Sequence, residues 1–289
     1  MNTFSIAIHG GAGTLVKGMM TPELETKYKA ALELALNTGY LVLENGGTAT
    51  DAVEAAVIVL EDSPLFNAGK GSVFTANETH EMDAAIMDGK SLNAGAVSLI
   101  TGIKNPVSLS RDVMEKSEHV FLAGEGAMEF AKDLNYKLED PSYFYDEFRH
   151  NQWLEIKDTD SFQLDHAKKK DSKFGTVGAV ACDQNGDIAA ATSTGGMTNK
   201  KFGRVGDSPM IGAGNYANNE TCAISCTGSG EYFIRGVVAY DVACLIEHKD
   251  MSIWDAADEV ISRRVLKLGG DGGLIAINSK GEISMPFNT

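Results

Sequence analysis

Gly175 and Thr176 lie where the character of the sequence changes abruptly. The stretch 168–175, KKKDSKFG, is polar and rich in lysine, whereas TVGAVA at 176–181 is small and apolar. An isolated Gly-Thr pair is usually an ordinary strand start. A threonine hydroxyl, however, becomes a good nucleophile when a base lies beside it. Cleavage of the Gly175–Thr176 bond would create an α-amine with a pKa of about 7.7–8.0, which is such a base.

Two downstream blocks carry further groups that suit this chemistry. Thr194 lies in TSTGGMTNK, and Thr227 and Gly228 lie in CTGSGE, where we expect strand ends. Hydroxyls and backbone amides at strand ends can form an oxyanion hole. Arg204 and Asp207 are three residues apart in GRVGDSP. Alone they would suggest a surface ion pair, but together they can hold an α-carboxylate and an α-ammonium group.

The overall charge argues against nucleic acid as a partner. The 289 residues include 25 basic and 40 acidic side chains, for a formal charge of -15, which repels a phosphate backbone. No apolar run is long enough to span a membrane, and the first residues carry no cationic signal-peptide region. We therefore expect a cytoplasmic protein without a membrane partner. The four cysteines form no C-x-x-C pair and are expected to be free, buried thiols.

The glycine-rich stretch HGGAGTL at 9–15 is similar to a dinucleotide-binding loop but does not match the full motif. The motif G-x-G-x-x-G needs a third glycine, and Val16 stands in its place after Gly11 and Gly13. A single histidine such as His9, without a second ligand at metal spacing, is more often structural than metal-binding. We expect neither a nucleotide nor a catalytic metal.

The first half of the chain alternates helical and strand patterns. Helices are predicted over 21–47, where Thr21 is the N-cap, and over 48–64, where Thr48 and Asp51 have the spacing of a capping box. Residues 80–100 predict a hairpin, and residues 106–134 predict two helical stretches around the apolar HVFLA. Residues from about 135 to 175 are charged and aperiodic, which predicts a long, flexible linker.

The second half repeats the alternation. A hairpin is predicted over 176–194, then helices over 231–248 and 252–269, the second capped by Ser252, and finally two strands. Small apolar strands on both sides of the linker suit sheets that are covered on both faces. The predicted fold is therefore α+β, a four-layer αββα sandwich that forms one structural domain.

Nine motifs resemble the plant-type L-asparaginase / isoaspartyl peptidase family of N-terminal-nucleophile hydrolases, threonine type. In chain order they are HGGAG (9–13), PLFNAGKGSVF (64–74), MDAAIMDG (82–89), GTVGAVA (175–181), STGGMTNK (193–200), GRVGDSP (203–209), GAGNYAN (212–218), CTGSGE (226–231) and MPFNT (285–289). The resemblance implies the αββα fold and self-cleavage before Thr176. It divides the chain into an α subunit, 1–175, and a β subunit, 176–289.

The resemblance also assigns the catalytic roles. It makes Thr176 the nucleophile and Thr194 the neighbour that hydrogen-bonds to it and orients it. Thr227 and the amide of Gly228 would form the oxyanion hole. Ser229 replaces the second threonine of the family's usual T-G-T-G block.

Substrate binding is assigned in the same way. Arg204 would bind the substrate α-carboxylate, while Asp207 and the carbonyl of Gly230 would bind its α-amine. Asn67 would lie close to the nucleophile. No cofactor is implied for catalysis, but the family holds a structural sodium ion through main-chain carbonyls, which here would be those of Leu60, Glu61, Ser63, Phe66, Ala68 and Lys70.

The expected function is hydrolysis of the β-amide of aspartyl compounds through an acyl-enzyme on Thr176. β-Aspartyl dipeptides are favoured, with L-asparagine also cleaved to aspartate and ammonia. The resemblance further implies self-association as a dimer of αβ pairs. A glycosylasparaginase is the near alternative, although such enzymes usually have aspartate before the nucleophile, where Gly175 stands. A catalytically silent small-molecule-binding homologue is the alternative from another class.

Overall fold

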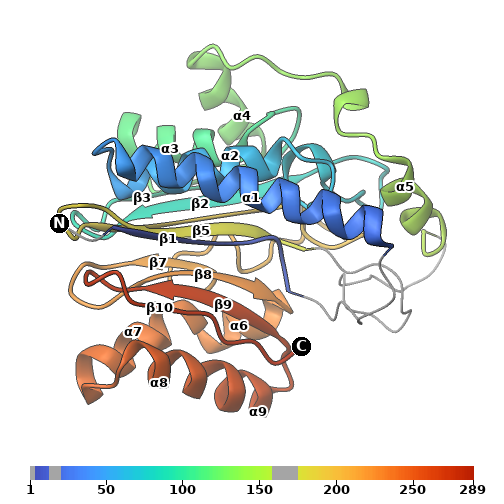
Figure 1. Ribbon diagram of the computed structural model, residues 1–289. Coiled ribbons are helices and arrows are strands. Elements are labelled where there is room, and N and C mark those ends of the chain that lie inside the picture. The colour runs from blue at the N-terminus through green and yellow to red at the C-terminus, as the bar shows by residue number, and fades with distance from the viewer. Residues whose placement is uncertain (1–3, 13–20, 158–174) are drawn as a thin grey trace.

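Helices cover both outer faces of two stacked sheets (Figure 1). The computed structural model describes residues 4–12, 21–157 and 175–289. Within these ranges one sheet has six strands in the order β1-β5-β6-β2-β3-β4, and the other has four in the order β10-β9-β8-β7. The predicted four-layer αββα sandwich is confirmed. No described helix is both long enough and apolar enough to cross a bilayer.

The larger sheet draws its strands from both sides of the Gly175–Thr176 bond. Its strands are β1 (Ser5–His9), β2 (Met82–Asp88), β3 (Ala94–Ile100), β4 (Phe121–Ala123), β5 (Val177–Cys182) and β6 (Ile188–Thr194). All neighbouring strands pair antiparallel except β3 and β4, which pair parallel. The hairpins predicted over 80–100 and 176–194 are confirmed. The second of them lies between β1 and β2.

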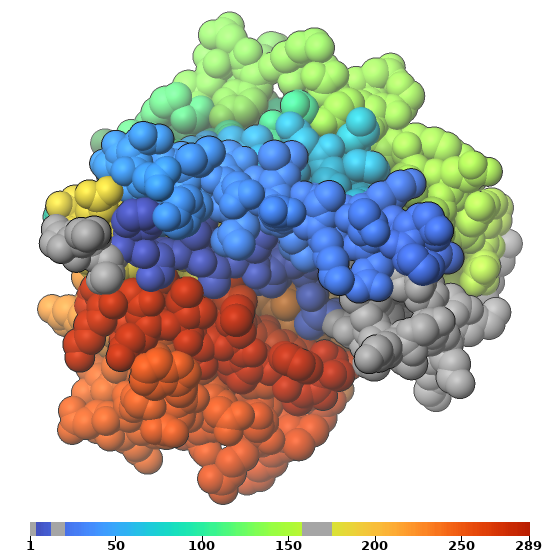
Figure 2. All heavy atoms as spheres, in the orientation of Figure 1, coloured from blue at the N-terminus to red at the C-terminus, as the bar shows by residue number. Residues whose placement is uncertain are grey.

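The smaller sheet contains only residues that follow Thr176. Its strands are β7 (Asn215–Ala217), β8 (Ala223–Gly228), β9 (Gly272–Ile277) and β10 (Ile283–Ser284). In the space-filling view, residues of this sheet and its helices, in orange and red, lie directly against the blue N-terminal segments (Figure 2). Small and branched apolar side chains fill the space between the sheets, among them Ala7, Val180, Ile188 and Ile275.

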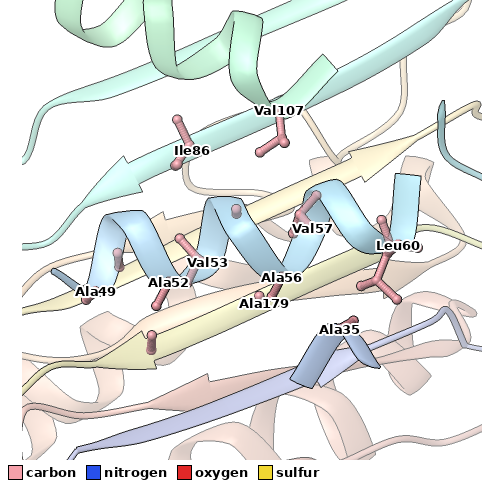
Figure 3. Packing of buried hydrophobic residues seen from close by; sticks show 14 of the residues in the cluster. Ala35, Ala49, Ala52, Val53, Ala56, Val57, Leu60, Ile86, Val107 and Ala179 are labelled. Atoms are coloured by element: carbon pink, nitrogen blue, oxygen red, sulfur yellow. The ribbon is translucent and has the colours of Figure 1, made fainter. Parts of the chain in front are cut away.

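The helices over the larger sheet are α1 (Pro22–Glu44), α2 (Ala49–Glu61), α3 (Pro106–Lys116) and α4 (Gly124–Asp133), and α5 (Glu147–Leu154) lies to one side of them (Figure 1). The predicted caps are present. Thr21 accepts a hydrogen bond from the Leu24 amide, and Thr48 and Asp51 form the reciprocal capping box that starts α2. Small side chains let α2 approach the sheet closely, since Ala52 and Ala56 belong to the same buried cluster as Ala179 of β5 (Figure 3).

The helices over the smaller sheet are α6 (Gly230–Gly236), α7 (Val238–Lys249), α8 (Ile253–Asp258) and α9 (Leu266–Leu268), with a π-helical segment, Glu259–Val265, between the last two. Ser252 caps α8 as predicted. The single helix predicted over 231–248 is wrong, because Val237 has a φ of 47° and separates α6 from α7. Nothing in the local sequence indicates that break, since valine rarely adopts positive φ.

The prediction of a linker from about residue 135 is wrong for residues 135–157. This stretch holds a 3₁₀ turn, Pro141–Tyr143, and helix α5. Phe144 and Trp153 are buried, and the rings of His80 and Trp153 lie 4.2 Å and 6.2 Å from that of Phe74. The aromatic residues that look randomly placed in the sequence therefore form one cluster with residues 74 and 80. The rest of the predicted linker, 158–174, lies outside the described residues.

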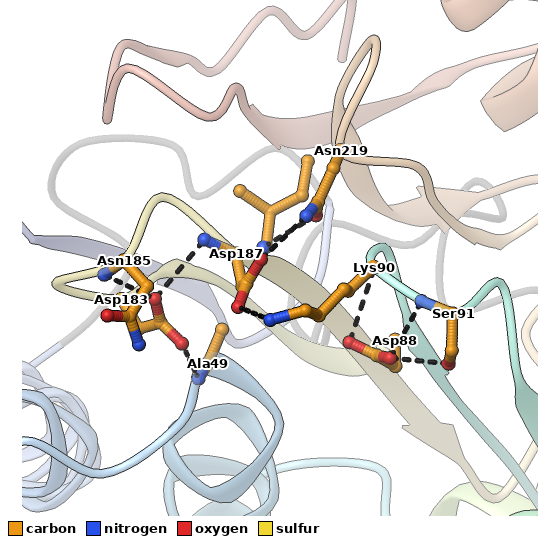
Figure 4. Close-up of polar contacts among 9 residues, drawn as sticks. Ala49, Asp88, Lys90, Ser91, Asp183, Asn185, Asp187 and Asn219 are labelled. Carbon is orange, nitrogen blue, oxygen red and sulfur yellow. Dashed lines mark hydrogen bonds and ion pairs between the residues drawn. The ribbon is translucent and has the colours of Figure 1, made fainter.

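A polar network fixes the end of the β5–β6 hairpin that is remote from Thr176 (Figure 4). Asp183 accepts a hydrogen bond from the first amide of α2, that of Ala49, at 3.3 Å. Asp187 accepts from Lys90 of the β2–β3 turn and from Asn219 of the β7–β8 turn, both at 2.8 Å. Four segments therefore meet at this hairpin turn, which fixes the direction in which the strands run toward Thr176 and Thr194.

Candidate active site

The hydroxyl of Thr176 faces two other hydroxyls. Thr176 precedes β5, and Thr194 ends the neighbouring strand β6. Thr176 Oγ1 donates to Thr194 Oγ1 at 3.1 Å and lies 3.4 Å from Ser208 Oγ. Thr194 and Ser208 are buried, whereas Thr176 is half-buried. The expected contact between the two threonines is present, and it gives the Thr176 hydroxyl a fixed hydrogen-bond direction.

A tight turn after β6 positions the Thr194 hydroxyl. The amide of Gly196 donates to Thr194 Oγ1 at 3.0 Å, and the carbonyl of Gly196 accepts from Asn67 Nδ2 at 2.7 Å. Gly196 has a φ of +80°, a conformation that glycine adopts without strain. Asn67 is almost completely buried and also accepts from the Val73 amide at 3.0 Å. Asn67 therefore lines the same cavity as Thr176, the expected nucleophile, and supports the turn that holds Thr194.

Thr227 and Gly228 end β8, on the opposite sheet. The Ala12 amide donates to Thr227 Oγ1 at 2.9 Å, so the threonine hydroxyl is left to act as a donor elsewhere. Gly228 has a φ of +155°, and a side chain on it would overlap the carbonyl oxygen of Asp271. Ser229 Oγ donates to the carboxylate of Asp271, so the residue that departs from the family pattern is engaged there.

Charged groups form the other wall. Arg204 Nε donates to Glu231 Oε1 at 2.9 Å, which leaves the outer edge of the guanidinium for another anion. Asp207 is buried, and its Oδ2 has no hydrogen-bond partner among the described residues. Burial raises the pKa of Asp207 to about 7. A Cβ on Gly230 would lie 2.7 Å from Asp207 Oδ1 and 3.0 Å from Arg204 Nη2, so a larger residue there would displace the two charged side chains.

These walls enclose a cavity of about 30 Å³, which exceeds the roughly 10–15 Å³ that one water molecule needs by the same measure. The residues that line it are Asn67, Gly175, Thr176, Thr194, Gly196, Met197, Arg204, Gly206, Asp207, Ser208, Thr227 and Gly228. Every predicted catalytic and substrate-binding residue is in this set except Gly230, which lies against Arg204 and Asp207. Gly175 also lines the cavity while the chain is intact.

Sequence reasoning missed Ser208 and Glu231. Both lie inside motifs that carry the resemblance, GRVGDSP and CTGSGE, but neither has a partner at a revealing spacing in the sequence. Ser208 is 32 residues from Thr176, and Glu231 is 27 residues from Arg204. Only the path of the chain between the two sheets brings these pairs together.

The predicted sodium loop curls tightly after α2. Side chains at Gly69 and Gly71 would overlap the carbonyl oxygens of Glu61 and Phe66 respectively, so the loop draws main-chain oxygens inward. The Phe66 and Ala68 carbonyls each accept one hydrogen bond within the loop, which leaves a second lone pair on each. Oxygen ligands of this type suit a hard cation. The residues present therefore fit the predicted ion.

The ionisable groups of Lys70 and Glu61 contact residues outside the loop. The Nζ of Lys70 lies 5.2 Å from the centre of the Tyr143 ring, in a cation–π contact. The side chain of Glu61 is buried, and its Oε1 accepts from the Val107 amide at 3.0 Å. Burial raises the pKa of Glu61 to about 8, so its side chain is held largely in the neutral form.

His9 has a structural environment. Its Nε2 lies 2.9 Å from Ser225 Oγ, and burial lowers its pKa to about 4, which keeps the ring neutral. The described ranges contain no group of three or more His, Cys, Asp or Glu side chains suited to a metal ion. All four cysteines are free; Cys182, Cys222 and Cys226 are buried as predicted, and Cys244 is only partly so.

Comparison with known proteins identifies the family. The family model described as asparaginase matches residues 2–289. The chain belongs to the asparaginase family. It is 49% identical over 287 residues to an isoaspartyl peptidase of Escherichia coli strain K12, covering 98% of this chain and 89% of that protein. It is 43% identical over 287 residues to an isoaspartyl peptidase/L-asparaginase of Xenopus laevis, with coverage of 98% and 89%.

An archaeal relative is similar to nearly the same extent. The plant-type L-asparaginase of Pyrococcus furiosus is 43% identical over 296 residues, covering 99% of this asparaginase-family chain and 93% of that protein. The names of these relatives cover both peptidase and asparaginase activities. Family membership thus confirms the predicted resemblance.

Proposed function

We propose that this protein is an amidohydrolase that cleaves itself before Thr176 and then hydrolyses the β-amide of aspartyl substrates. The observation that carries the proposal is the hydrogen bond from Thr176 Oγ1 to Thr194 Oγ1 in a cavity that also contains Arg204 and Asp207. A hydroxyl nucleophile, donors for an oxyanion and a pair of opposite charges meet there. These are the groups that acyl transfer from an amino-acid side chain needs.

The first step is activation of the chain itself. Thr176 Oγ1 attacks the carbonyl carbon of Gly175, and the peptide nitrogen leaves as the α-amine of Thr176, which converts the amide to an ester. Water then hydrolyses the ester, giving a carboxylate on Gly175 and a free hydroxyl on Thr176. Release of Gly175 removes one of the residues that line the cavity.

In turnover, the new α-amine removes the proton from Thr176 Oγ1, which attacks the side-chain carbonyl of the substrate. The Thr227 hydroxyl and the Gly228 amide donate to the oxyanion. The protonated amine then donates its proton to the leaving group, ammonia or the amine of a dipeptide. Water attacks the acyl-enzyme to release aspartate and regenerate Thr176. Thr194 Oγ1 keeps the nucleophile oriented throughout.

The charged wall determines which substrate enters. The guanidinium of Arg204 pairs with the α-carboxylate, and Asp207 with the Gly230 carbonyl binds the α-ammonium. The unpartnered Oδ2 of Asp207 supports this role, because a buried carboxylate oxygen gains most from a charged donor. Both β-aspartyl dipeptides and L-asparagine carry this aspartyl head. We propose β-aspartyl dipeptides as the preferred substrates, with L-asparagine also cleaved.

A sodium ion would be held by the main-chain carbonyls of the loop from Leu60 to Lys70. The ion supplies structural charge when bound and takes no part in the reaction. Asn67 lies in this loop, and its carbonyl accepts from the Gly195 amide at 3.0 Å. Stabilising the loop therefore stabilises the turn that holds Thr194.

The proposed assembly is a dimer of αβ pairs, and the proposed location is the cytoplasm. Both rest on the family resemblance and on the sequence. Sedimentation equilibrium tests the assembly, with an expected mass of about twice the 30.8 kDa chain. A mass equal to a single chain would contradict it.

Electrophoresis under denaturing conditions and activity assays test the function. Scaling 30.8 kDa by 175/289 and 114/289 predicts fragments of about 18.7 and 12.1 kDa, the smaller beginning Thr-Val-Gly-Ala. β-Asp-Leu, L-asparagine and glycosylated asparagine are assayed side by side. Thr176→Ala should remain one chain and lose turnover. An active protein with an uncut chain, or preference for the glycosylated substrate, would contradict the proposal.

A further inference from the structure

A buried ion pair lies behind the turn that holds Thr194. The Nζ of Lys200 is 4.0 Å from Asp83 Oδ2, and the side chains are 1% and 0% exposed. Lys200 Nζ also donates to the Glu81 carbonyl at 2.7 Å. Neither residue lines the catalytic cavity, and neither has a role in the proposed chemistry.

Asp83 is tied to the strand that carries Thr194. In the antiparallel pairing of β2 with β6, Asp83 is directly opposite Thr194. Cross-strand partners project from the same face of a sheet, so the carboxylate and the Thr194 hydroxyl share one face. Asp83 Oδ1 accepts a hydrogen bond from the Leu99 amide of β3 at 2.9 Å, and Leu99 has a φ of 56°. Asp83 Oδ2 has no hydrogen-bond partner among the described residues.

Lys200 is tied to the Gly196 turn. A Cβ on Gly196 would lie 3.2 Å from both Cδ and Nζ of Lys200, so the lysine stem packs directly against this turn. The backbone of Lys200 is held as well, because its amide donates to the Met197 carbonyl at 3.2 Å and its carbonyl accepts from the Ala76 amide at 3.0 Å. The lysine thus closes the loop that begins at Thr194.

Stability alone does not account for a pair of charges in this place. Burial raises the pKa of Asp83 and lowers that of Lys200, which means that burial disfavours the charged form of each group. Apolar residues of similar volume are commonly as stabilising as a buried ion pair, or more so. What the charges add is a fixed geometry between the strand β2 and the Gly196 turn.

We propose that Asp83 and Lys200 are positioning residues, which hold the Gly196 turn so that Thr194 Oγ1 faces Thr176 Oγ1. The chain of contacts runs from Asp83 to Lys200, from the lysine stem to Gly196, and from the Gly196 amide to the Thr194 hydroxyl. The inference rests on the proposed function, since it concerns the same nucleophile. Arg204 is held by Glu231, and Asp83 and Lys200 also interact electrostatically with it, but with opposite charges. Removing both charges together should therefore affect substrate binding much less than the chemical step.

The test compares Lys200→Met with the double variant Asp83→Asn/Lys200→Met. The single variant leaves a buried carboxylate unpaired and should lower Tm, whereas the double variant removes both charges and should recover most of that loss. If the pair positions Thr194, the double variant still has a kcat about 10- to 100-fold below wild type, with KM within about threefold. Activity is measured per cleaved chain, with the cleaved fraction taken from intact-mass spectra. A folded double variant that cleaves itself at least about tenfold more slowly also supports the inference.

Lys90→Met is the matched control. It removes a Lys–Asp contact at 2.8 Å, with Asp187, at the far end of the β5–β6 hairpin, where the lysine side chain is 68% exposed. Its kcat should equal that of wild type. A double variant with kcat and self-cleavage within about twofold of wild type would overturn the positioning role while leaving the proposed function intact. A wild-type protein without activity on β-Asp-Leu and L-asparagine would instead overturn the proposed function. If Lys200→Met does not fold, the double variant alone decides.

Discussion

The catalytic cavity has two walls that are held in different ways. On the nucleophile wall, Thr176, Thr194 and Thr227 lie at strand ends and are fixed by hydrogen bonds between neutral groups. On the recognition wall, Arg204 and Asp207 lie in the loop between β6 and β7, and charge dominates their contacts. The register of the sheets fixes the side-chain positions on the nucleophile wall, whereas electrostatic contacts fix them on the recognition wall.

This difference indicates which wall should determine kcat and which should determine KM. Neutral hydrogen bonds contribute about 0.5–1.5 kcal/mol and act over a short range, whereas hydrogen bonds to charged groups contribute about 1.5–3 kcal/mol. Changes on the nucleophile wall should therefore alter kcat, and changes on the recognition wall should alter KM, with a dependence on pH and salt. Four experiments test this division, and their expected effects decrease from Thr194 to Glu231.

Thr194→Val should give the largest effect. The substitution keeps the shape but removes the oxygen that accepts from Thr176 and from the Gly196 amide. We expect kcat to fall by at least about 100-fold with little change in KM, because the orientation of the nucleophile is lost. Steady-state kinetics on β-Asp-Leu measure both constants. Thr192→Val, two residues earlier on the same face of β6, is the control, and a comparable loss of kcat there would argue against a specific role for Thr194.

Arg204→Gln should raise KM by about 10- to 100-fold. The substitution replaces the guanidinium group that would bind the substrate carboxylate by an uncharged amide. kcat at saturation should change by much less. Arg263→Gln, which removes a cation from the exposed pair with Glu259, should leave both constants unchanged. An unchanged KM in Arg204→Gln would remove this residue from the substrate site.

The pH dependence of inhibition by L-aspartate tests Asp207. Its pKa is about 7 in the free enzyme, so the group is mostly protonated below that pH and must lose a proton to pair with an ammonium. We expect the inhibition constant to rise about tenfold per pH unit below about 7 and to be flat above it. Succinate, which lacks the ammonium, is the control. If succinate and L-aspartate have the same pH profile, Asp207 does not bind the amine.

Glu231→Gln should give the smallest effect. The Glu231 side chain is 49% exposed, so solvent screens its contact with Arg204 Nε. We expect KM to rise by about three- to fivefold at low salt and by less at high salt, with kcat unchanged. Measurement of KM at two ionic strengths detects this. A fall in kcat without a change in KM would place Glu231 on the nucleophile wall instead.

Local signals in the sequence predicted most of the fold. Thr48 and Asp51 mark the start of α2 because a capping box needs only residues three apart. The hairpins were predictable for the same reason, since alternation and turn residues are local. The motifs around Thr176 and Thr194 also led to the correct neighbours, because the two residues belong to one hairpin.

Interactions between distant segments were not predictable in this way. Trp153 packs on Phe74 and Phe144 packs on His80, in each case across about sixty residues or more, so the stretch from 135 to 157 looked aperiodic although it is folded. The contacts of Ser208 with Thr176 and of Lys200 with Asp83 also join separate elements. A sequence pattern reports the hydrophobic periodicity within one helix or strand. These contacts depend instead on how separate helices, strands and loops pack together.

The strand order of the larger sheet has a consequence for the proposed cut. The hairpin β5–β6 inserts between β1 and β2, so each fragment supplies the edges that the other one pairs with. Fragments 1–175 and 176–289 made from separate genes would each expose unsatisfied strand edges, which favour aggregation. Because the fragments stay paired across the sheet, cleavage of the Gly175–Thr176 bond should leave the fold intact. Because the separate fragments would aggregate, the chain should fold as one polypeptide before it is cleaved.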